Sequence, residues 1–353
     1  MKRVAVVFGG ASVEREVSVV SARTIVGGFA PPYAAVPVAI DPAGRFRGES
    51  DSRKILERGF GAVGEAGERV PEGLFAGIDA VFPIAHGETG EDGTLQGFLE
   101  TVGLPYAGSD VASSALGMNK AAFKARMREA GLPMAKSFAI DREEWRNGAS
   151  AAADAIALRL PLPLFVKPSA GGSSLGVSKV KRWEELGAAV EVAFEYDRTV
   201  LVEEGIDARE IECAILGNDE PAASGCGEIV PGREFYDYDD KYISDGARLL
   251  VPAPLPEDVT ERIRALALAA FSRCGCSGFA RIDFFLERAS GRVFLNELNT
   301  LPGFTSISMF PKLWQEAGLT LPALLARIME LAFERFEARG AAAARRRAPP
   351  GLR

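Results

Sequence analysis

The sequence predicts an α/β protein whose N-terminal domain is built on a small parallel β-sheet and is followed by a larger second domain. Short apolar strands alternate with helical segments over residues 1–118, which is the pattern of strand–helix–strand units. The composition changes near residues 118–120, and two strand–loop–strand segments follow, over residues 164–180 and 281–299. These observations place the boundary between the two domains after residue 118.

Composition is that of an ordinary globular protein. The chain has 353 residues, enough for two or three domains, and is 47% hydrophobic and 25% charged. A formal net charge of −7 argues against a nucleic-acid scaffold, so we expect no nucleic-acid partner. One histidine excludes a histidine-rich zinc site, and four cysteines without CxxC spacing are no disulfide framework.

The first residues, MKRVAVVFGG, predict a buried strand rather than a secretion signal. Their apolar run ends at Gly9, and the acidic residues Glu14 and Glu16 follow. Elsewhere no segment is apolar over the length that spans a membrane. We therefore expect a cytoplasmic protein without a membrane partner.

The N-terminal domain is predicted to contain three strands and one long helix. The strands cover residues 3–8, 34–40 and 80–84, and the helix covers residues 13–29. Ser12 is suited to be the helix N-cap, and acidic residues occupy the first turn. The pattern over residues 42–73 predicts no element.

Two glycine-rich loops follow strands of this domain. Gly9-Gly10 lets a ligand approach the helix N-terminus, but G-x-G-x-x-G is missing and Asp41 lies too far downstream for a dinucleotide site. His86 lies in the loop over residues 85–93, where ligands of parallel sheets bind. A structural hydrogen bond and a catalytic role both explain a single histidine there.

The second domain is predicted to begin with a helix over residues 120–130, which Gly131 and Pro133 end. The other predicted elements are helices over residues 150–160 and 322–336 and strands over residues 164–167, 177–180, 200–204 and 210–216. The basic residues 336–353 are predicted to form a disordered tail.

The hairpin over residues 281–299, ARIDFFLERASGRVFLNELN with its preceding Ala280, carries the most informative polar pattern. A five-residue turn sets Asp283 opposite Glu297 and Arg281 opposite Asn299, all on one face. The opposite face is predicted to carry Ile282, Phe284, Leu286, Phe294 and Leu298. Facing carboxylates repel, so a cation is expected between them, and these oxygen donors suit Mg²⁺. A solvated polar face is the alternative.

The segment LFVKPSAGGSSLGVSKV, residues 164–180, predicts a phosphate site. Lys167 ends a strand, and the loop after it offers backbone N–H groups with the hydroxyls of Ser173 and Ser174. A plain hairpin turn is the alternative, which the acidic hairpin elsewhere makes less favourable.

Two further segments are suited to bind a ligand. The strand over residues 200–204 ends with backbone groups that fit an adenine edge, and Glu210 lies on the next strand. The loop FYDYDDKYIS, residues 235–244, is either solvated or closes over the ligand.

Together these stretches resemble the D-alanine–D-alanine ligases of the ATP-grasp superfamily. The matching segments are GGASVEREVS, HGETGEDGTLQG, LGMNK, FVKPSAGGSSLGVSKV, LVEEGIDAREIECAILG, FYDYDDKYISD, ARIDFF and LNELNTLPGFTSIS, in the family's order across residues 4–333. The resemblance implies a pre-ATP-grasp domain (residues 1–118) and an α+β ATP-grasp domain (119–335) with a lid subdomain (119–207) and a metal and catalytic subdomain (208–335). It also implies a homodimer.

The resemblance implies that ATP and metal ions bind between the two subdomains. The implied nucleotide contacts are Lys120 and Lys167 at the phosphates, Ser173 and Ser174 in the lid, Glu203, the Glu204 backbone and Ile206 at adenine, Glu210 at the ribose, and Lys241 and Phe285. The implied ligands of two Mg²⁺ ions, or of Mn²⁺ in their place, are Asp283, Glu297 and Asn299.

The implied reaction joins two D-alanines for peptidoglycan precursor synthesis, through an acyl phosphate made from ATP. The implied substrate and catalytic residues are Glu14 at the first ammonium group with His86 nearby, Arg281 and the Gly303 N–H at the oxyanion, Ser308 at the second carboxylate, and Lys241 and Tyr242 on the closing loop. A hydrogen-bond chain from Glu14 through Ser173 to Tyr242 would lock that loop.

Other activities stay open at this point. Another ATP-grasp carboxylate–amine ligase, including one that makes D-alanyl-D-lactate or D-alanyl-D-serine, has similar motifs, although the resemblance associates Tyr242 with dipeptide synthesis. A nucleotide-binding regulator without turnover is the alternative from another class, and the complete set of Arg281, Asp283, Glu297 and Asn299 argues against it.

Overall fold

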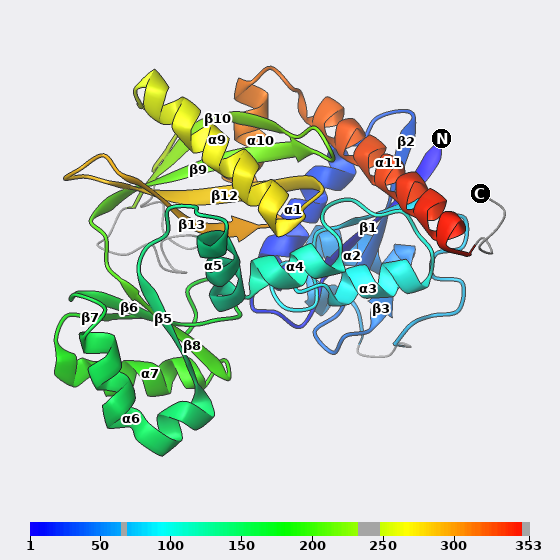
Figure 1. The fold of residues 1–353 in the computed structure, drawn as a ribbon. Coiled ribbons are helices and arrows are strands. Elements are labelled where there is room, and N and C mark those ends of the chain that lie inside the picture. Colours follow the sequence, from blue (N-terminus) through cyan, green and yellow to red (C-terminus); the bar gives the residue numbers. More distant parts are fainter. Residues whose placement is uncertain (65–68, 232–247, 348–353) are drawn as a thin grey trace.

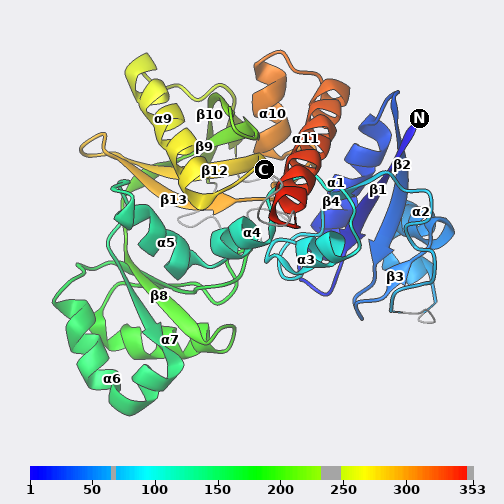
Figure 2. The ribbon, with the colours of Figure 1, turned by 45° about the vertical axis from the view of Figure 1, so that its right-hand side comes forward.

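The computed structural model describes residues 1–64, 69–231 and 248–347, which form three β-sheets with helices packed around them (Figure 1). The N-terminal sheet has the strand order β3-β2-β1-β4, the second sheet β5-β8-β6-β7, and the third sheet β11-β10-β9-β12-β13. Figure 2 shows the N-terminal sheet at the right and the second sheet with its helices at the lower left. The third sheet shares contacts with both.

The N-terminal sheet is parallel around its central strand, as predicted. Its elements are β1 (Lys2–Gly9), α1 (Arg15–Gly28), β2 (Tyr33–Ile40), β3 (Phe46–Arg47), α2 (Glu49–Arg58), η1 (Phe60–Ala62), β4 (Ala80–Pro83), α3 (Thr94–Thr101) and α4 (Val111–Met118). Strand β1 pairs in parallel with β2 and β4, and its apolar side chains are buried on both faces. Strand β3 and helix α2 lie in the segment for which no element was predicted.

The predicted start of the first helix is wrong. Helix α1 begins at Arg15, and its N-cap position is Glu14 rather than Ser12. The Ser12 hydroxyl accepts a hydrogen bond from the Glu14 N–H at 3.1 Å, in the turn that precedes the helix. Glu14 is thereby placed at the N-terminus of α1, facing the centre of the molecule.

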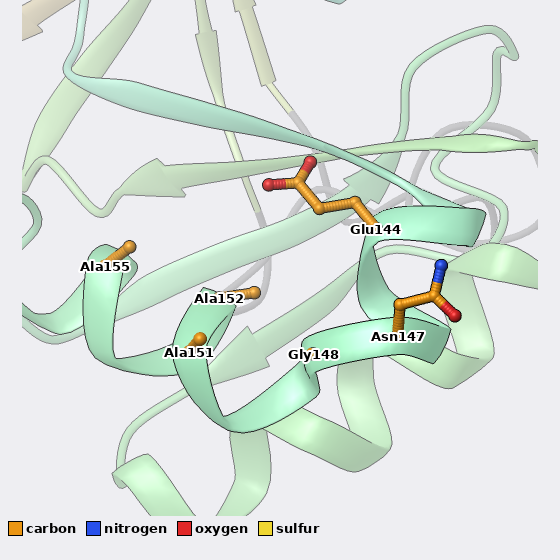
Figure 3. Close-up of a pocket in the computed structure, with 6 residues that line it drawn as sticks. All are labelled: Glu144, Asn147, Gly148, Ala151, Ala152 and Ala155. Carbon is orange, nitrogen blue, oxygen red and sulfur yellow. The ribbon is translucent and has the colours of Figure 1, made fainter.

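The second sheet is antiparallel throughout and carries α6 and α7 on one face. Its elements are β5 (Ser137–Asp141), α6 (Arg142–Ala157), β6 (Leu164–Pro168), β7 (Ser178–Val180), η2 (Trp183–Glu185), α7 (Leu186–Phe194) and β8 (Thr199–Glu204). Helix α6 begins earlier than the predicted residue 150 and is broken at Gly148. A hollow lies over this break (Figure 3), lined by Glu144, Asn147, Gly148 and three alanine methyl groups. These groups provide no catalytic constellation.

The third sheet is the largest and is covered on both faces. Its strands are β9 (Ala208–Gly217), β10 (Ala222–Val230), β11 (Arg248–Leu250), β12 (Gly278–Glu287) and β13 (Val293–Asn299); its helices are α5 (Lys120–Glu129), α9 (Glu257–Cys274), α10 (Met309–Glu316) and α11 (Leu321–Arg347). Helices α5 and α9 cover one face. On the other face, Phe279 of β12 packs against Phe82 of β4 at 5.8 Å between ring centroids, within a core that includes α10 and α11. The third sheet and the N-terminal sheet therefore share one core.

The predicted pairing of the β12–β13 hairpin is correct where the polar residues lie and wrong near the turn. Asp283 pairs with Glu297 and Arg281 with Asn299, but Leu286 pairs with Val293 because a β-bulge leaves Asn296 unpaired. The bulge reverses the faces on the turn side. The core face therefore carries Val293 and Leu295, and Phe294 lies beside Phe285 on the other face, contrary to the prediction.

Helix α11 continues to Arg347, well into the segment predicted to be a disordered tail. Arg335 donates to the Tyr106 carbonyl oxygen at 2.9 Å, and its guanidinium lies 4.2 Å from the Tyr106 ring centroid. Arg339 pairs with Glu100, so two arginines hold this helix against the N-terminal domain. None of the helices formed by the described residues combines the length and hydrophobicity needed to cross a lipid bilayer.

The buried ion pair between Asp41 and Arg47 gives a prediction about stability. Burial would raise the pKa of Asp41, but N–H donors of Arg45 and Ala43 and the Arg47 guanidinium outweigh burial and lower it. Because the pKa is lower in the folded state, the stabilisation is complete above the unfolded pKa of 3.8 and disappears as pH falls through the folded value.

We expect Asp41→Asn to lower the free energy of unfolding by about 2 kcal/mol at pH 7, and to differ less from the native protein as pH falls below about 4. Urea unfolding at several pH values measures this. Asp51→Asn, which removes the exposed pair with Lys54 on α2, is the control and should change stability by less than about 0.5 kcal/mol. An equal loss in both variants would contradict the assignment.

Candidate active site

A cavity lies between the second and third sheets and is closed at one end by residues of the N-terminal domain. Every described residue that the sequence analysis placed in the site lines this cavity. They are Glu14, His86, Lys120, Lys167, Ser173, Ser174, Glu203, Glu204, Ile206, Glu210, Arg281, Asp283, Phe285, Glu297, Asn299, Gly303 and Ser308. Lys241 and Tyr242 lie outside the described residues.

Three carboxylates lie on adjacent strands at one wall of the cavity. Glu212 of β9 pairs in register with Asp283 of β12, which pairs with Glu297 of β13. Arg281 lies against two of these carboxylates: its Nε and Nη2 each lie 2.7 Å from an Asp283 oxygen, and Nε also lies 3.1 Å from Glu212. The cation expected between Asp283 and Glu297 stays a prediction. Burial would lower the pKa of Arg281, but Asp283 and Glu212 outweigh it and raise the pKa.

Glu212 was missed by the sequence analysis. Its spacing of two from Glu210 shows that both share one face of a strand, but only the pairing of β9 with β12 brings it to Asp283. Among the described residues, no three His, Cys, Asp or Glu side chains converge as a metal site. The predicted set of two carboxylates and the Asn299 amide is a different donor set, and it fits Mg²⁺ with water and phosphate oxygens as further ligands.

A buried carboxylate between two lysines forms the facing wall. Glu203 of β8 is 4% exposed; its Oε1 lies 2.7 Å from Lys124 Nζ, and its Oε2 pairs with Lys167. Burial would raise the pKa of Glu203, but the two ammonium groups outweigh it and lower the pKa to about 2. Lys124 was also missed, although it follows Lys120 by four residues and so lies on the same helix face.

The loop between β6 and β7 is tied to α5 and to the start of α1. Lys120 Nζ donates to the Gly171 carbonyl oxygen at 2.5 Å, and the Ser173 hydroxyl hydrogen-bonds to Glu14. Ser173 and Ser174 have φ angles of 52° and 58°, a left-handed conformation that is uncommon for residues with a side chain. This loop, residues 169–177, thus covers the cavity from the second sheet to the start of α1, and we call it the roof loop.

His86 is the centre of a buried hydrogen-bond chain. Its Nδ1 lies 3.2 Å from Glu91 Oε1, and its Nε2 lies 3.2 Å from the Ser21 hydroxyl, which accepts from the Phe304 N–H at 3.1 Å. This arrangement fits the structural interpretation of His86 and fixes the backbone next to Gly303. Sequence reasoning missed Ser21 and Glu91.

The linker between β8 and β9 forms the far end of the cavity. The Gly205 N–H donates to the Pro163 carbonyl oxygen at 2.7 Å, and the Glu204 side chain accepts from the Lys136 N–H at 2.8 Å. Among the described residues, none pairs with the backbone N–H or C=O of Ile206. Phe165 and Phe285 line the cavity from facing sheets, so this end is apolar with exposed backbone groups.

Comparisons with known proteins agree with this arrangement. A family described as "D-ala D-ala ligase N-terminus" matches residues 3–109, and one described as "D-ala D-ala ligase C-terminus" matches residues 126–330. The chain belongs to the D-alanine–D-alanine ligase family. Members of this family are ATP-dependent ligases, so the predictions of the family and of an ATP-dependent ligase are confirmed.

Relatives named as D-alanine–D-alanine ligases match over nearly their whole length. One from Chlorobium phaeovibrioides is 44% identical over 94% of this chain and 97% of its own. A D-alanine–D-alanine ligase A from Chromobacterium violaceum is 46% identical over 94% and 95%. Ligation of D-alanine to D-alanine with ATP is the activity of this family, as predicted.

Solved structures of D-alanine ligases have the same fold. The D-alanine–D-alanine ligase from Coxiella burnetii superposes with a TM-score of 0.82 at 34% identity, covering 97% of each chain. The VanG D-Ala:D-Ser ligase from Enterococcus faecalis also gives 0.82, at 36% identity, covering 94% of this chain and 99% of its own. The predicted α/β architecture is therefore confirmed.

The contact between the roof loop and α1 gives a prediction about this D-alanine ligase site. A Cβ at Gly172 would lie 2.7 Å from Glu14 Oε2, so Gly172→Ala must displace the carboxylate that Ser173 holds. We expect kcat/KM for D-alanine to fall about tenfold, the effect of losing one hydrogen bond to a charged group, with little change in thermal stability. Steady-state kinetics and thermal unfolding measure the two effects.

Gly187→Ala on α7 is the control, since no atom lies within 4 Å of its Cβ position. It should leave kcat/KM unchanged. Unaltered kinetics in Gly172→Ala would show that the Glu14–Ser173 contact is not needed for turnover.

Proposed function

We propose that this chain binds ATP and two D-alanines in the cavity between the second and third sheets and joins them to D-alanyl-D-alanine for peptidoglycan precursor synthesis. One observation carries the proposal. One wall of the cavity carries lysines and the loop between β6 and β7. The opposite wall carries Arg281, Asp283, Glu297 and Asn299. Cations suit the phosphates of ATP, and the opposing oxygen donors suit the metal ions that accompany them.

ATP would lie along the cavity with its adenine at the linker. The backbone groups of Ile206, which have no partner among the described residues, and the rings of Phe165 and Phe285 support an adenine there. Glu210 lines the same cavity, and we assign it to the ribose. We assign the phosphates to Lys120, Lys167 and the roof loop with Ser173 and Ser174. Two lysines hold the Glu203 carboxylate in a fixed position. We assign the adenine contacts to Glu203 in that position and to the backbone of the neighbouring residue, Glu204.

Two Mg²⁺ ions, or Mn²⁺ in their place, would be held by Asp283, Glu297 and Asn299. The Arg281 guanidinium already stands against Asp283 and Glu212, which supports a cation-binding face. When bound, the ions neutralise phosphate charge and orient the phosphates.

The chemistry divides into two steps. A carboxylate oxygen of the first D-alanine attacks the γ-phosphorus, and ADP leaves with the electron pair of the broken P–O bond, giving an acyl phosphate. The neutral amine of the second D-alanine then attacks the acyl carbon, and phosphate leaves with the electron pair of the broken C–O bond and takes up the proton that the amide nitrogen loses. Glu14, with His86 nearby, holds the first ammonium group, and Ser308 binds the second carboxylate.

Arg281 and the Gly303 N–H would stabilise the tetrahedral oxyanion of the second step. Electrostatic contacts made where charge develops are the largest catalytic contributions in such sites. The loop that carries Lys241 and Tyr242 would close over the substrates, with Tyr242 extending the Glu14–Ser173 contact.

We also propose the domain limits and setting expected from the sequence. Residues 1–118 are the substrate-binding domain, residues 119–207 the lid subdomain and residues 208–335 the catalytic subdomain, each containing one of the three sheets. The protein acts as a homodimer in the cytoplasm, where ATP and peptidoglycan precursors are made.

D-serine is the second candidate acceptor, because the D-Ala:D-Ser ligase VanG matches this fold as well as a D-alanine–D-alanine ligase does. We expect D-alanyl-D-alanine to be the main product when D-alanine competes with equal D-serine or D-lactate, and no product from L-alanine. Phosphate release and mass analysis of the products measure this. If D-alanyl-D-serine or D-alanyl-D-lactate were the main product, D-serine or D-lactate would be the preferred acceptor instead. Absence of ATP turnover with D-alanine would refute the proposal.

Arg281→Met tests the catalytic assignment. Because the oxyanion exists only after the amine attacks, we expect kcat to fall by 10²–10³, equal to about 3–4 kcal/mol, while ATP affinity changes little. Arg209→Met is a matched control, since Arg209 makes a bidentate pair with Glu228 at 2.8 and 2.6 Å and does not line the cavity. Loss of ATP affinity with unchanged kcat would place Arg281 in the nucleotide site instead.

A further inference from the structure

Lys124 is a buried lysine that no step of the proposed reaction uses. It lies on α5, one turn after Lys120, and its side chain is 1% exposed. Burial of an ammonium group is costly unless it is paired, so a lysine at this position needs a reason. Its Nζ contacts two residues that belong to different walls of the cavity, Glu203 of the second sheet and Asn296 of the third.

The first contact is with Glu203. Lys124 approaches Oε1 from outside the cavity at 2.7 Å, whereas Lys167, which lines the cavity, pairs with Oε2. One carboxylate is thus shared by two ammonium groups. Lys124 neutralises Glu203 from behind, and a positive charge remains on the cavity side at Lys167.

The second contact is with the β-bulge of β13. Lys124 Nζ donates to the carbonyl oxygen of Asn296 at 3.1 Å, and Asn296 is the residue that the ladder leaves unpaired. Glu297 follows directly on the same strand. The ammonium group therefore satisfies the bulge carbonyl and connects the second sheet to the third, behind the cavity.

We propose that Lys124 is a positioning residue for nucleotide binding: it holds and neutralises Glu203, so that the charge of Lys167 stays available to the phosphates of the nucleotide. This inference deepens the proposed function and rests on it. Without Lys124, Glu203 would be left with Lys167 alone, and the buried carboxylate would cancel the cation that should meet the phosphates.

The test is nucleotide binding without metal or D-alanine, measured by calorimetry. In Lys124→Met, which keeps the length of the side chain, we expect the Kd of ADP to rise about tenfold, the size of one charged contact. The Kd of adenosine, which carries no phosphate, should stay the same. Equal weakening of ADP and adenosine would show a general disturbance of the site and would overturn the proposal.

A double variant separates charge from structure. Lys124→Met with Glu203→Gln removes both charges and leaves Lys167 free, so we expect the ADP:adenosine affinity ratio to return to within about threefold of the native ratio. If Lys124→Met does not fold, the double variant is compared with Glu203→Gln alone. Because Lys124 is proposed to act through Glu203, the two variants should bind ADP and adenosine with Kd values equal to within about threefold, whereas a purely structural Lys124 would weaken both ligands in the double variant. A ratio as low as in the single variant would refute the proposal.

Arg47→Met is the matched control for loss of a buried cation. Arg47 pairs with Asp41 in the N-terminal domain, and both side chains are almost fully buried. This variant should lose thermal stability but keep the native Kd of ADP; weakened ADP binding here would mean that instability alone explains the effect. Native protein that fails to bind ADP would instead refute the proposed function, so the two failures are distinguishable.

Discussion

A carboxylate that leaves water needs a cation beside it, and this constraint shapes both walls of the cavity. Glu203 is held between Lys124 and Lys167, and Asp283 with Glu212 is held by Arg281. Each pairing joins elements that are far apart in the chain. The charges that would bind ATP and metal are therefore the same charges that hold the walls in place, and the site and the fold cannot vary independently.

The core shared by the N-terminal and third sheets fixes the position of Gly303 relative to helix α1, which begins next to Glu14. Phe82, Phe279, Phe304 and Phe310 pack with ring centroids 5.4–6.2 Å apart. Phe304 directly follows Gly303, and its N–H is bound by Ser21 of α1. An aromatic cluster of this kind resists displacement because close-packed rings have no free volume to move into. The Gly303 backbone, our proposed oxyanion donor, and Glu14, our proposed contact for the first ammonium group, are thus fixed to one rigid body.

Sequence reasoning succeeded where the signal is local. Alternation along the strands and the turn length placed Arg281, Asp283, Glu297 and Asn299 on one face. It failed where the partner is distant: Glu212 depends on the pairing of β9 with β12, and Lys124 depends on α5 packing against β8. The bulge at Asn296 has no composition signal, which is why Phe294 was placed on the wrong face. The tail was misjudged because its alanines and arginines favour helix, and Arg335 and Arg339 hold that helix down.

The packing of α11 has a consequence for synthesis on the ribosome. This helix, residues 321–347, covers apolar side chains of the N-terminal sheet and even places Phe333 under the ammonium group of Lys2. At about 5–20 residues per second, on the order of tens of seconds separate translation of β1 from translation of its cover. During that interval the N-terminal sheet of the nascent chain exposes the apolar side chains that α11 later covers. Chaperone demand in the cell should therefore depend on how promptly the last helix emerges.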